Sequence, residues 1–201
     1  MTAADVRGIP DPPKRPAAPR LVPRHDTEWT DEERELLLPS VAPGANGMHW
    51  FATMIRNVDL YRRWRPLARY LNGSVRLSAR ERELVILRVA WLCQSDYEWG
   101  QHVLVARSVG ISETDIEAVR GGEVDSFSMI EAAIVRLADQ FVADFCVDEQ
   151  TWTTLAAHYA DDQLLELILL VGHYFMVGFA LNSVGVQRER DVPGFEAPAS
   201  P

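Results

Sequence analysis

The feature that most limits how this chain can fold is a nearly unbroken apolar run, LLELILLVGHYFMVGFAL, from Leu164 to Leu181. A run of this length is long enough to cross a bilayer as a helix. Glu166 and His173 interrupt it, two glycines lie within it, and no basic cluster or aromatic belt flanks it. The sequence therefore favours a buried central helix of a soluble helical oligomer, with no membrane as a partner.

Helical periodicity recurs through most of the remaining chain, with almost no strand-like alternation. Ser78 with Glu81, and Ser128 with Glu131, have the spacing of a capping box, which marks the start of a helix. Helix candidates span residues 30–38, 47–56, 58–71, 79–93, 95–108, 112–121, 129–145, 149–158 and 162–185. Pro66 is expected to kink or shorten the third of them. The pattern predicts an all-α, single-domain bundle of about eight helices.

The two ends of the chain differ in composition from this helical body. Residues 1–26 contain half of the twelve prolines, which indicates an extended N-terminal arm, either disordered or laid on a neighbouring subunit. The C-terminal tail, residues 191–201, has a similar composition and is expected to be flexible. The helical domain is therefore expected at residues 27–190. No apolar segment near the N-terminus fits a signal peptide, so a cytoplasmic location is expected.

Charge and apolar content bear on the partners of the protein. The chain of 201 residues carries 20 Lys and Arg against 29 Asp and Glu, a formal charge of −9, and no Lys/Arg-rich block. Nucleic acid is not an expected partner, because neutralising phosphates needs a basic stripe. Helices this apolar in a chain of this size usually hide their excess apolar face between subunits. We therefore expect a homo-oligomer, either a dimer, a trimer or a hexamer.

Polar residues gather in one short stretch, WLCQSDYEWGQH, between two apolar helical runs. Ser95, Glu98 and His102 are spaced i, i+3, i+7, which places them on one stripe of a helix. Glu83 precedes them on the inward face of the preceding helix, so its carboxylate is expected to point the same way. Cys93 lies two residues before Ser95, about 200° round a continuous helix, and is expected to face away.

This region resembles the carboxymuconolactone decarboxylase family, which includes the alkylhydroperoxidase D-like proteins. The resemblance rests on RERELVILRVAWLCQSDYEWGQHVLVARSVGISETDIEAV and extends over residues 50–120, more weakly as far as 182. In the peroxidase branch of that family the motif is Glu, eleven residues, Cys, two residues, Cys, three residues, His. Here Glu83, Ser95, Glu98 and His102 occupy those positions, so both thiols of the motif are replaced. A thiol peroxidase needs one thiolate to attack and a second to resolve, which disfavours that chemistry.

The other chemistry that the resemblance implies is cofactor-free acid–base catalysis on a small carboxylated lactone. His102 is the expected proton donor, with Glu98 holding its tautomer and Glu83 tuning it from the neighbouring helix. Four further side chains are expected to contact the substrate: Ser95, Tyr97, Trp99 and His173. No metal is expected, because the histidines at 49, 102 and 173 show none of the usual ligand spacings.

Two other functions stay open at this stage. The first is a peroxide-handling protein that retained the fold with a degraded redox centre. The second is a non-catalytic helical oligomer that binds a ligand or a protein. A Glu–His pair on helices is often no more than a buried hydrogen bond that ties two helices together, and aromatic residues at helical spacing are often core residues.

Overall fold

The computed structural model describes residues 15–38, 49–73 and 76–195, and over these residues it is entirely helical. One short 3-10 helix, η2 (Asp26–Glu28), precedes the α-helices. These are α1 (Asp31–Leu37), α2 (His49–Met54), α3 (Val58–Gly73), α4 (Ala79–Leu92), α5 (Asp96–Ser108), α6 (Glu113–Gly121), α7 (Met129–Ala143), α8 (Glu149–Ala156) and α9 (Asp161–Val184). The prediction of an all-α helical bundle is confirmed, and the structure shows nine α-helices in the described residues where about eight were expected.

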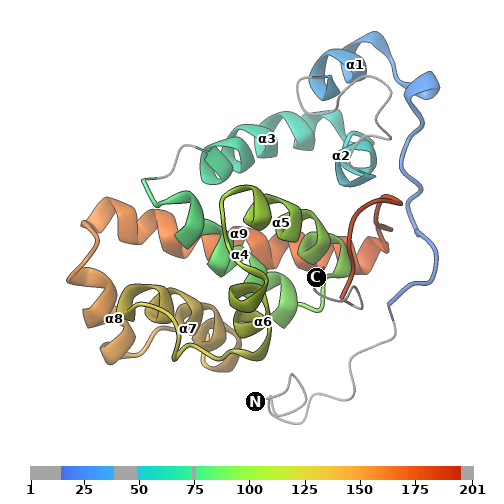
Figure 1. Cartoon of the computed structure of the whole chain (residues 1–201). Coiled ribbons are helices and arrows are strands. Elements are labelled where there is room, and N and C mark those ends of the chain that lie inside the picture. Colours follow the sequence, from blue (N-terminus) through green and yellow to red (C-terminus); the bar gives the residue numbers. More distant parts are fainter. Residues whose placement is uncertain (1–14, 39–48, 74–75, 196–201) are drawn as a thin grey trace.

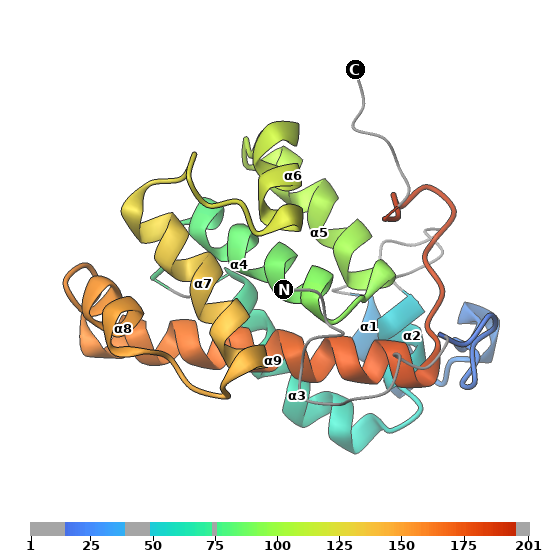
Figure 2. The ribbon, with the colours of Figure 1, turned by 90° about the horizontal axis from the view of Figure 1, so that it is seen from below.

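Helix α4 lies at the centre of the bundle and contacts α5, α6, α7 and α9 (Figure 1). Its residues from Leu84 to Ala90 are buried on every side, which is why the sequence shows no polar face there. Seen from below, α9 runs across the lower part of the picture, with α3 below it and the α7–α8 pair above it (Figure 2). In this arrangement α4, α5 and α9 surround the polar residues of the motif.

Side-chain caps fix where several helices begin. Thr30, Ser78 and Ser128 each accept a hydrogen bond from the third helical backbone amide, and a glutamate at that position reaches back to the cap amide. These are the capping boxes that the sequence spacing predicts for Ser78 and Ser128. Such caps satisfy amides that have no partner within their own helix. The start of α4, which carries Glu83, is therefore set locally by sequence.

Helix α3 does not end early at Pro66. It continues through Pro66 as far as Gly73. Proline removes one helical hydrogen bond, normally made to the carbonyl four residues earlier. Both Pro66 and Arg62 are exposed, so water can bind that carbonyl instead.

The two ends of the chain lie along its own helical body where they are described. The backbone amide of Arg20 donates to the carbonyl of Val184 at 2.7 Å, so part of the N-terminal arm is laid on its own subunit. Residues 191–195, the described part of the C-terminal tail, pack against α5. Phe195 donates its backbone amide to Asp96 at 2.8 Å, and Val192 is buried. The rest of the predicted arm and tail, 1–14 and 196–201, lies outside the described residues.

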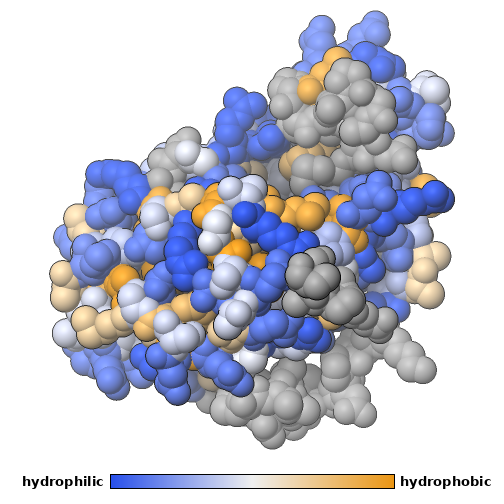
Figure 3. All heavy atoms as spheres, in the orientation of Figure 1, coloured by the Kyte–Doolittle hydropathy of each residue, from blue (hydrophilic) through white to orange (hydrophobic). Residues whose placement is uncertain are grey.

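Within the described residues, α9 alone is long and apolar enough to span a membrane, and 56% of its most apolar window is buried in the bundle. The buried side of α9 contributes to the main hydrophobic core together with α4 and α7. On the face of the molecule shown in Figure 3, hydrophobic side chains are interspersed with polar and charged ones. One side of α9 is therefore part of the core, although α4 and not α9 lies at the centre of the bundle.

Candidate functional site

A hydrogen bond between α4 and α5 forms the centre of the site. Nδ1 of His102 lies 2.7 Å from Oε2 of Glu83. Arg82 donates through Nε to the other oxygen of that carboxylate at 3.2 Å. Glu83 is buried, whereas the side chains of His102 and Arg82 keep 14% and 13% of their exposure. This group of three side chains is therefore accessible to solvent through His102 and Arg82, and not through Glu83.

The surroundings of Glu83 keep its carboxylate ionised. Burial acts to raise its pKa, but the charge and hydrogen bond of His102, with those of Arg82, bring the pKa below its ordinary value. An ionised carboxylate only accepts hydrogen bonds, so Nδ1 of His102 carries the shared proton. This tautomer leaves Nε2 of His102 to exchange a proton with another molecule.

Glu98 has the opposite environment. Its side chain is buried on α5, and neither carboxyl oxygen has a hydrogen-bond partner among the described residues. Burial raises the pKa of Glu98 well above its ordinary value, and the nearby hydroxyl of Ser95 acts against this without reversing it. Burial therefore favours the neutral form of this carboxyl group over the carboxylate. The expectation that Glu98 holds the tautomer of His102 is wrong, since Glu83 makes that contact.

Ser95 is the residue before the first turn of α5, where its spacing to Glu98 resembles a capping box. The hydroxyl of Ser95 nevertheless makes no capping bond. It is completely buried and, like the carboxyl group of Glu98, has no partner among the described residues. Two polar groups that are buried side by side without partners are costly in a folded protein and mark a place of functional interest.

Cys93 lies beside Glu98, contrary to the expectation that it faces away. That expectation assumed one continuous helix. The helical conformation is interrupted between α4 and α5 at Gln94, which has a φ of 52°. A Cβ atom built on Gly178 of α9 would lie 2.9 Å from Oε2 of Glu98 and 3.1 Å from Sγ of Cys93. Burial raises the pKa of the Cys93 thiol far above its ordinary value, and Glu98 acts in the same direction. The thiol is therefore a poor nucleophile.

Tyr174 of α9 lies against His102 and was not singled out from the sequence. Its ring meets that of His102 edge-on at a centroid distance of 5.0 Å, and its hydroxyl donates to Oδ1 of Asn72. Burial raises the pKa of Tyr174, and both Glu83 and Glu98 act in the same direction, so both lie close to it. The site is thus shared among α3, α4, α5 and α9.

His173 lies at the edge of this cluster. Its ring stacks on Trp64 of α3 at 5.8 Å and meets the ring of Tyr174 edge-on. Its Nδ1 atom is buried without a partner among the described residues, and burial lowers its pKa to about 4. His173 is therefore neutral at physiological pH. Its position next to Tyr174 in the apolar run was the one sequence signal that could have pointed to Tyr174.

Trp99 and Tyr97, both expected to bind substrate, have other surroundings. The ring of Trp99 packs against those of Trp91 and Phe195 in a hydrophobic cluster. The hydroxyl of Tyr97 donates to Glu189 at 3.0 Å. Phe195 and Glu189 both belong to the C-terminal segment, which we define as residues 186–195, after α9. The side chains of Trp99 and Tyr97 therefore contact this segment and not the hydrogen-bonded pair of His102 and Glu83.

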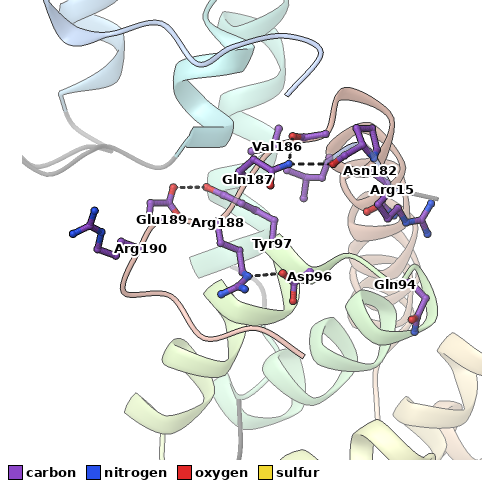
Figure 4. Close-up of a pocket in the computed structure, with 13 residues that line it drawn as sticks. Arg15, Gln94, Asp96, Tyr97, Asn182, Val186, Gln187, Arg188, Glu189 and Arg190 are labelled. Atoms are coloured by element: carbon purple, nitrogen blue, oxygen red, sulfur yellow. Dashed lines mark hydrogen bonds and ion pairs between the residues drawn. The ribbon is translucent and has the colours of Figure 1, made fainter. Parts of the chain in front are cut away.

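A cavity of about 350 Å³ lies where α5 begins, between the N-terminal arm, the end of α9 and the C-terminal segment (Figure 4). Its lining includes Tyr97, Asn182, Gln187, Arg188 and Glu189. Most of these side chains are bonded within the lining or to nearby backbone; Arg188, for example, pairs with Asp96. Glu83, Glu98 and His102 do not line this cavity.

In the part of the chain that the structure describes, no group of three or more His, Cys, Asp and Glu side chains is placed to hold a metal ion. The groups that the structure does bring together are one ionised carboxylate, one imidazole, one neutral carboxyl and one phenol. Each of these can accept or donate a proton or a hydrogen bond without help from an ion. The arrangement is therefore suited to acid–base chemistry.

Part of the chain that carries the site matches a family model. Residues 59–140, from α3 into α7, match the model of the carboxymuconolactone decarboxylase family. This match covers less than half of the chain and includes the motif around Glu83 and His102. The matched region carries Glu83, Glu98 and His102 but ends before Tyr174. No curated protein matches the chain.

Solved structures of the alkylhydroperoxidase D-like fold are similar to this one. An alkylhydroperoxidase AhpD core protein from Ralstonia eutropha JMP134, described as peroxidase-related, has a TM-score of 0.72 at 15% identity over 85% of this chain and 94% of its own. A peroxidase-related protein from Silicibacter sp. TM1040 has a TM-score of 0.68 at 16% identity over 91% and 95%. The debrominase Bmp8, as a variant in complex with 2,3,4-tribromopyrrole, has a TM-score of 0.70 at 12% identity over 85% and 91%. At these identities the likeness shows the fold.

Proposed function

We propose that this protein is a cofactor-free acid–base enzyme, a decarboxylase, lyase or isomerase that acts on a small carboxylated or lactone-like molecule. The observation that carries the proposal is the opposite environment of two carboxyl groups beside one imidazole. His102 and Arg82 outweigh burial and lower the pKa of Glu83, whereas burial raises the pKa of Glu98 well above its ordinary value. Two such groups with pKa values pushed apart are typical of an acid–base pair.

Decarboxylation of a carboxylated lactone sets two tasks for the site. When the bond to the carboxylate carbon breaks, CO2 leaves and its electron pair passes into the lactone carbonyl, which becomes an enolate. The enzyme must stabilise the enolate oxygen and then deliver a proton to carbon, which restores the carbonyl. Isomerisation by proton transfer uses the same two functions without loss of CO2.

The described residues can be assigned to these tasks. His102 delivers the proton from Nε2, because its Nδ1 is held by Glu83 at 2.7 Å and the imidazolium is stabilised by that carboxylate. The carboxyl group of Glu98, whose raised pKa favours the protonated form, and the hydroxyl of Ser95 are both buried with no hydrogen-bond partner among the described residues. Both can donate to an enolate oxygen. Arg82 lies at the surface end of the site, where its guanidinium attracts a carboxylate. Tyr174 positions His102 by edge-on contact.

The direct test is incubation of purified protein with 4-carboxymuconolactone, following CO2 release. His102→Ala is expected to lose at least ~100-fold in kcat/KM, the contribution of a general acid. Glu113→Gln, which changes a surface carboxylate paired with Arg107, is the matched control and should keep full activity. Equal activity of His102→Ala and the control contradicts the assignment. No activity in any variant, with wild type included, leaves the non-catalytic binding protein as the better account.

A second candidate, a peroxide-handling protein, has one specific observation in its favour, the position of Cys93 beside Glu98. The raised thiol pKa acts against it, because the thiolate is the reactive form. Cys146 is exposed, so it serves as the control cysteine. Consumption of hydrogen peroxide with a thiol reductant that is lost in Cys93→Ser and kept in Cys146→Ser would favour this candidate over the acid–base enzyme.

A further inference from the structure

One face of α9 is apolar and exposed over most of its length. Its large side chains retain half or more of their exposure: Leu165 59%, Leu169 52%, Met176 50% and Phe179 59%. Ile168 and Phe175 lie half-buried beside them. No charged residue occurs in α9 after Glu166. Contiguous apolar surface of this kind is uncommon on a monomer and marks an interaction site.

Gly172 lies at the middle of this face, and nothing within the described chain requires a glycine there. A Cβ atom built on Gly172 meets no atom within 4 Å. The other glycines inside helices differ, since a Cβ atom on Gly178 would crowd Glu98 and one on Gly100 would crowd Pro193. Glycine in a helix interior costs roughly 0.5–1 kcal/mol relative to alanine. A close approach from outside the subunit would explain it.

The face is symmetric about Gly172. Apolar side chains occur three, four and seven residues before it, at Leu169, Ile168 and Leu165. Apolar side chains also occur three, four and seven residues after it, at Phe175, Met176 and Phe179. An identical helix that runs antiparallel and crosses at Gly172 would place each group of three against the other group. A face that matches itself in this way suits a two-fold interface.

The charges at the two ends of α9 are complementary in the same arrangement. Asp161, in the first turn, lies eleven residues before Gly172, and Ser183 lies eleven residues after it. Arg20 of the N-terminal arm is held at Ser183 by a hydrogen bond from its guanidinium to that carbonyl at 3.0 Å. Antiparallel crossing would bring Asp161 of one copy to Arg20 of the other. It would also place opposite ends of the two helix dipoles together.

We infer that this face of α9 is the contact surface of a two-fold homodimer, in which α9 crosses its symmetry mate antiparallel at Gly172. Tyr70 of α3, 42% exposed and bonded to Glu166 beside the face, extends the surface onto the neighbouring helix. The glycine lets the two backbones approach closely, and the six apolar side chains around it bury one another. This inference is independent of the reaction proposed above.

Cysteine cross-linking tests the geometry in the full chain, with the exposed Cys146 replaced by serine. Gly172→Cys is expected to form a disulfide-linked dimer under mild oxidation, because the two-fold axis brings residue 172 of both copies together. Leu165→Cys and Phe179→Cys are each expected to stay unlinked alone and to link when the two proteins are mixed. Linking of Phe179→Cys with itself and not with Leu165→Cys would overturn the antiparallel crossing.

Sedimentation equilibrium with variants tests the surface itself. Met176→Glu and Gly172→Trp are each expected to weaken dimerisation at least ~30-fold, as truncation of a central interface residue commonly does. Leu104→Glu, at a residue of α5 with 42% exposure, is the matched control and should dimerise as wild type does. Circular dichroism checks that each variant is folded, and open space around Gly172 makes its substitution harmless to the monomer.

Other occupants of the face give different results. A wild-type protein that stays monomeric at all concentrations overturns the dimer. If that monomer then binds phosphatidylcholine vesicles and Met176→Glu abolishes the binding, the face contacts lipid. If deletion of residues 1–14 converts a monomer into a dimer, the N-terminal segment covers the face in the full chain.

Discussion

Nδ1 of His102 lies 2.7 Å from Oε2 of Glu83, and this bond joins α4 to α5 within the region that matches the family. Glu98, four residues before His102 on the same helix, makes no such bond and is buried without a partner among the described residues. The pKa values of the two glutamates are therefore shifted in opposite directions. These differences can be measured without knowledge of the substrate.

Glu83→Gln keeps an acceptor oxygen for His102 but removes the negative charge. The bond to Nδ1 should weaken, and a larger share of His102 should carry its proton on Nε2, because the ionised carboxylate favours the Nδ1–H form. Nitrogen-15 chemical shifts of the imidazole in labelled protein report the tautomer. An unchanged tautomer in Glu83→Gln would show that Glu83 does not hold the ring.

The stability of Glu98→Gln should depend on pH differently from that of wild type. The raised pKa means that folded protein keeps a proton on Glu98 that the unfolded chain releases above its own pKa of about 4.3. The contribution of Glu98 to wild-type stability therefore falls as pH rises above that value, by up to about 1.4 kcal/mol per pH unit, until the folded group also ionises. Glu98→Gln should lack this fall and be the more stable protein at pH 8. Urea unfolding at pH 5 and pH 8 measures the difference.

The contribution of Glu83 to folding stability should depend on pH in the opposite direction to that of Glu98. Its lowered pKa means that the ionised form stabilises the folded protein above the unfolded pKa, and that this contribution is lost as pH falls through the folded pKa. The destabilisation caused by Glu83→Gln should therefore be largest near pH 7 and shrink in acid. Parallel pH profiles for the two glutamine variants would contradict the assignment of opposite protonation states.

Two glycines on α9 provide a matched pair of substitutions. Gly178→Ala places a methyl group 2.9 Å from Glu98 and 3.1 Å from Cys93, and should destabilise the protein by about 1–3 kcal/mol through overpacking. Gly172→Ala meets no atom within 4 Å and should instead stabilise the isolated subunit by roughly 0.5–1 kcal/mol. Thermal unfolding at a low protein concentration compares them. Equal effects would contradict the close packing at Gly178.

The C-terminal segment should be displaced by Gly100→Ala. A Cβ atom at this position of α5 would overlap the carbonyl of Pro193, which lies on the helix backbone. We expect faster amide hydrogen exchange at Val192 and Phe195 in this variant, because the segment would no longer pack against α5. Gly73→Ala, at the exposed end of α3 with open space around it, is the control. Unchanged exchange in Gly100→Ala would contradict the packing of residues 191–195.

The sequence predicted the helices well, because their signals are local. Capping boxes and the i, i+3, i+4 pattern of apolar residues depend on a few neighbouring positions, and α4 and α7 begin at the expected residues. The motif also identified Glu83, Glu98 and His102 as candidate residues. These features depend on residues close together in the sequence, so they can be predicted without knowing how the helices pack.

The partners within the site could not be predicted, because they depend on how separate helices meet. The sequence spacing placed Glu98 one turn from His102 on the same helix. In the structure the side chain of Glu98 is buried, and Glu83 of α4 makes the hydrogen bond with His102 instead. The interruption of the helix at Gln94 places Cys93 beside Glu98. This position could not be predicted from helical periodicity, which assumes one continuous helix. Tyr174 lies in a run so uniformly apolar that its contact with His102 has no signature in sequence.

Infrared difference spectroscopy of wild type against Glu98→Gln at pH 7 tests the central claim most directly. Wild type is expected to show a C=O stretching band of a protonated carboxyl group that the variant lacks, because burial keeps Glu98 neutral. Glu83→Gln should keep that band and lose carboxylate bands instead. Loss of carboxylate bands in Glu98→Gln, with no protonated band in wild type, would contradict the neutral state of Glu98.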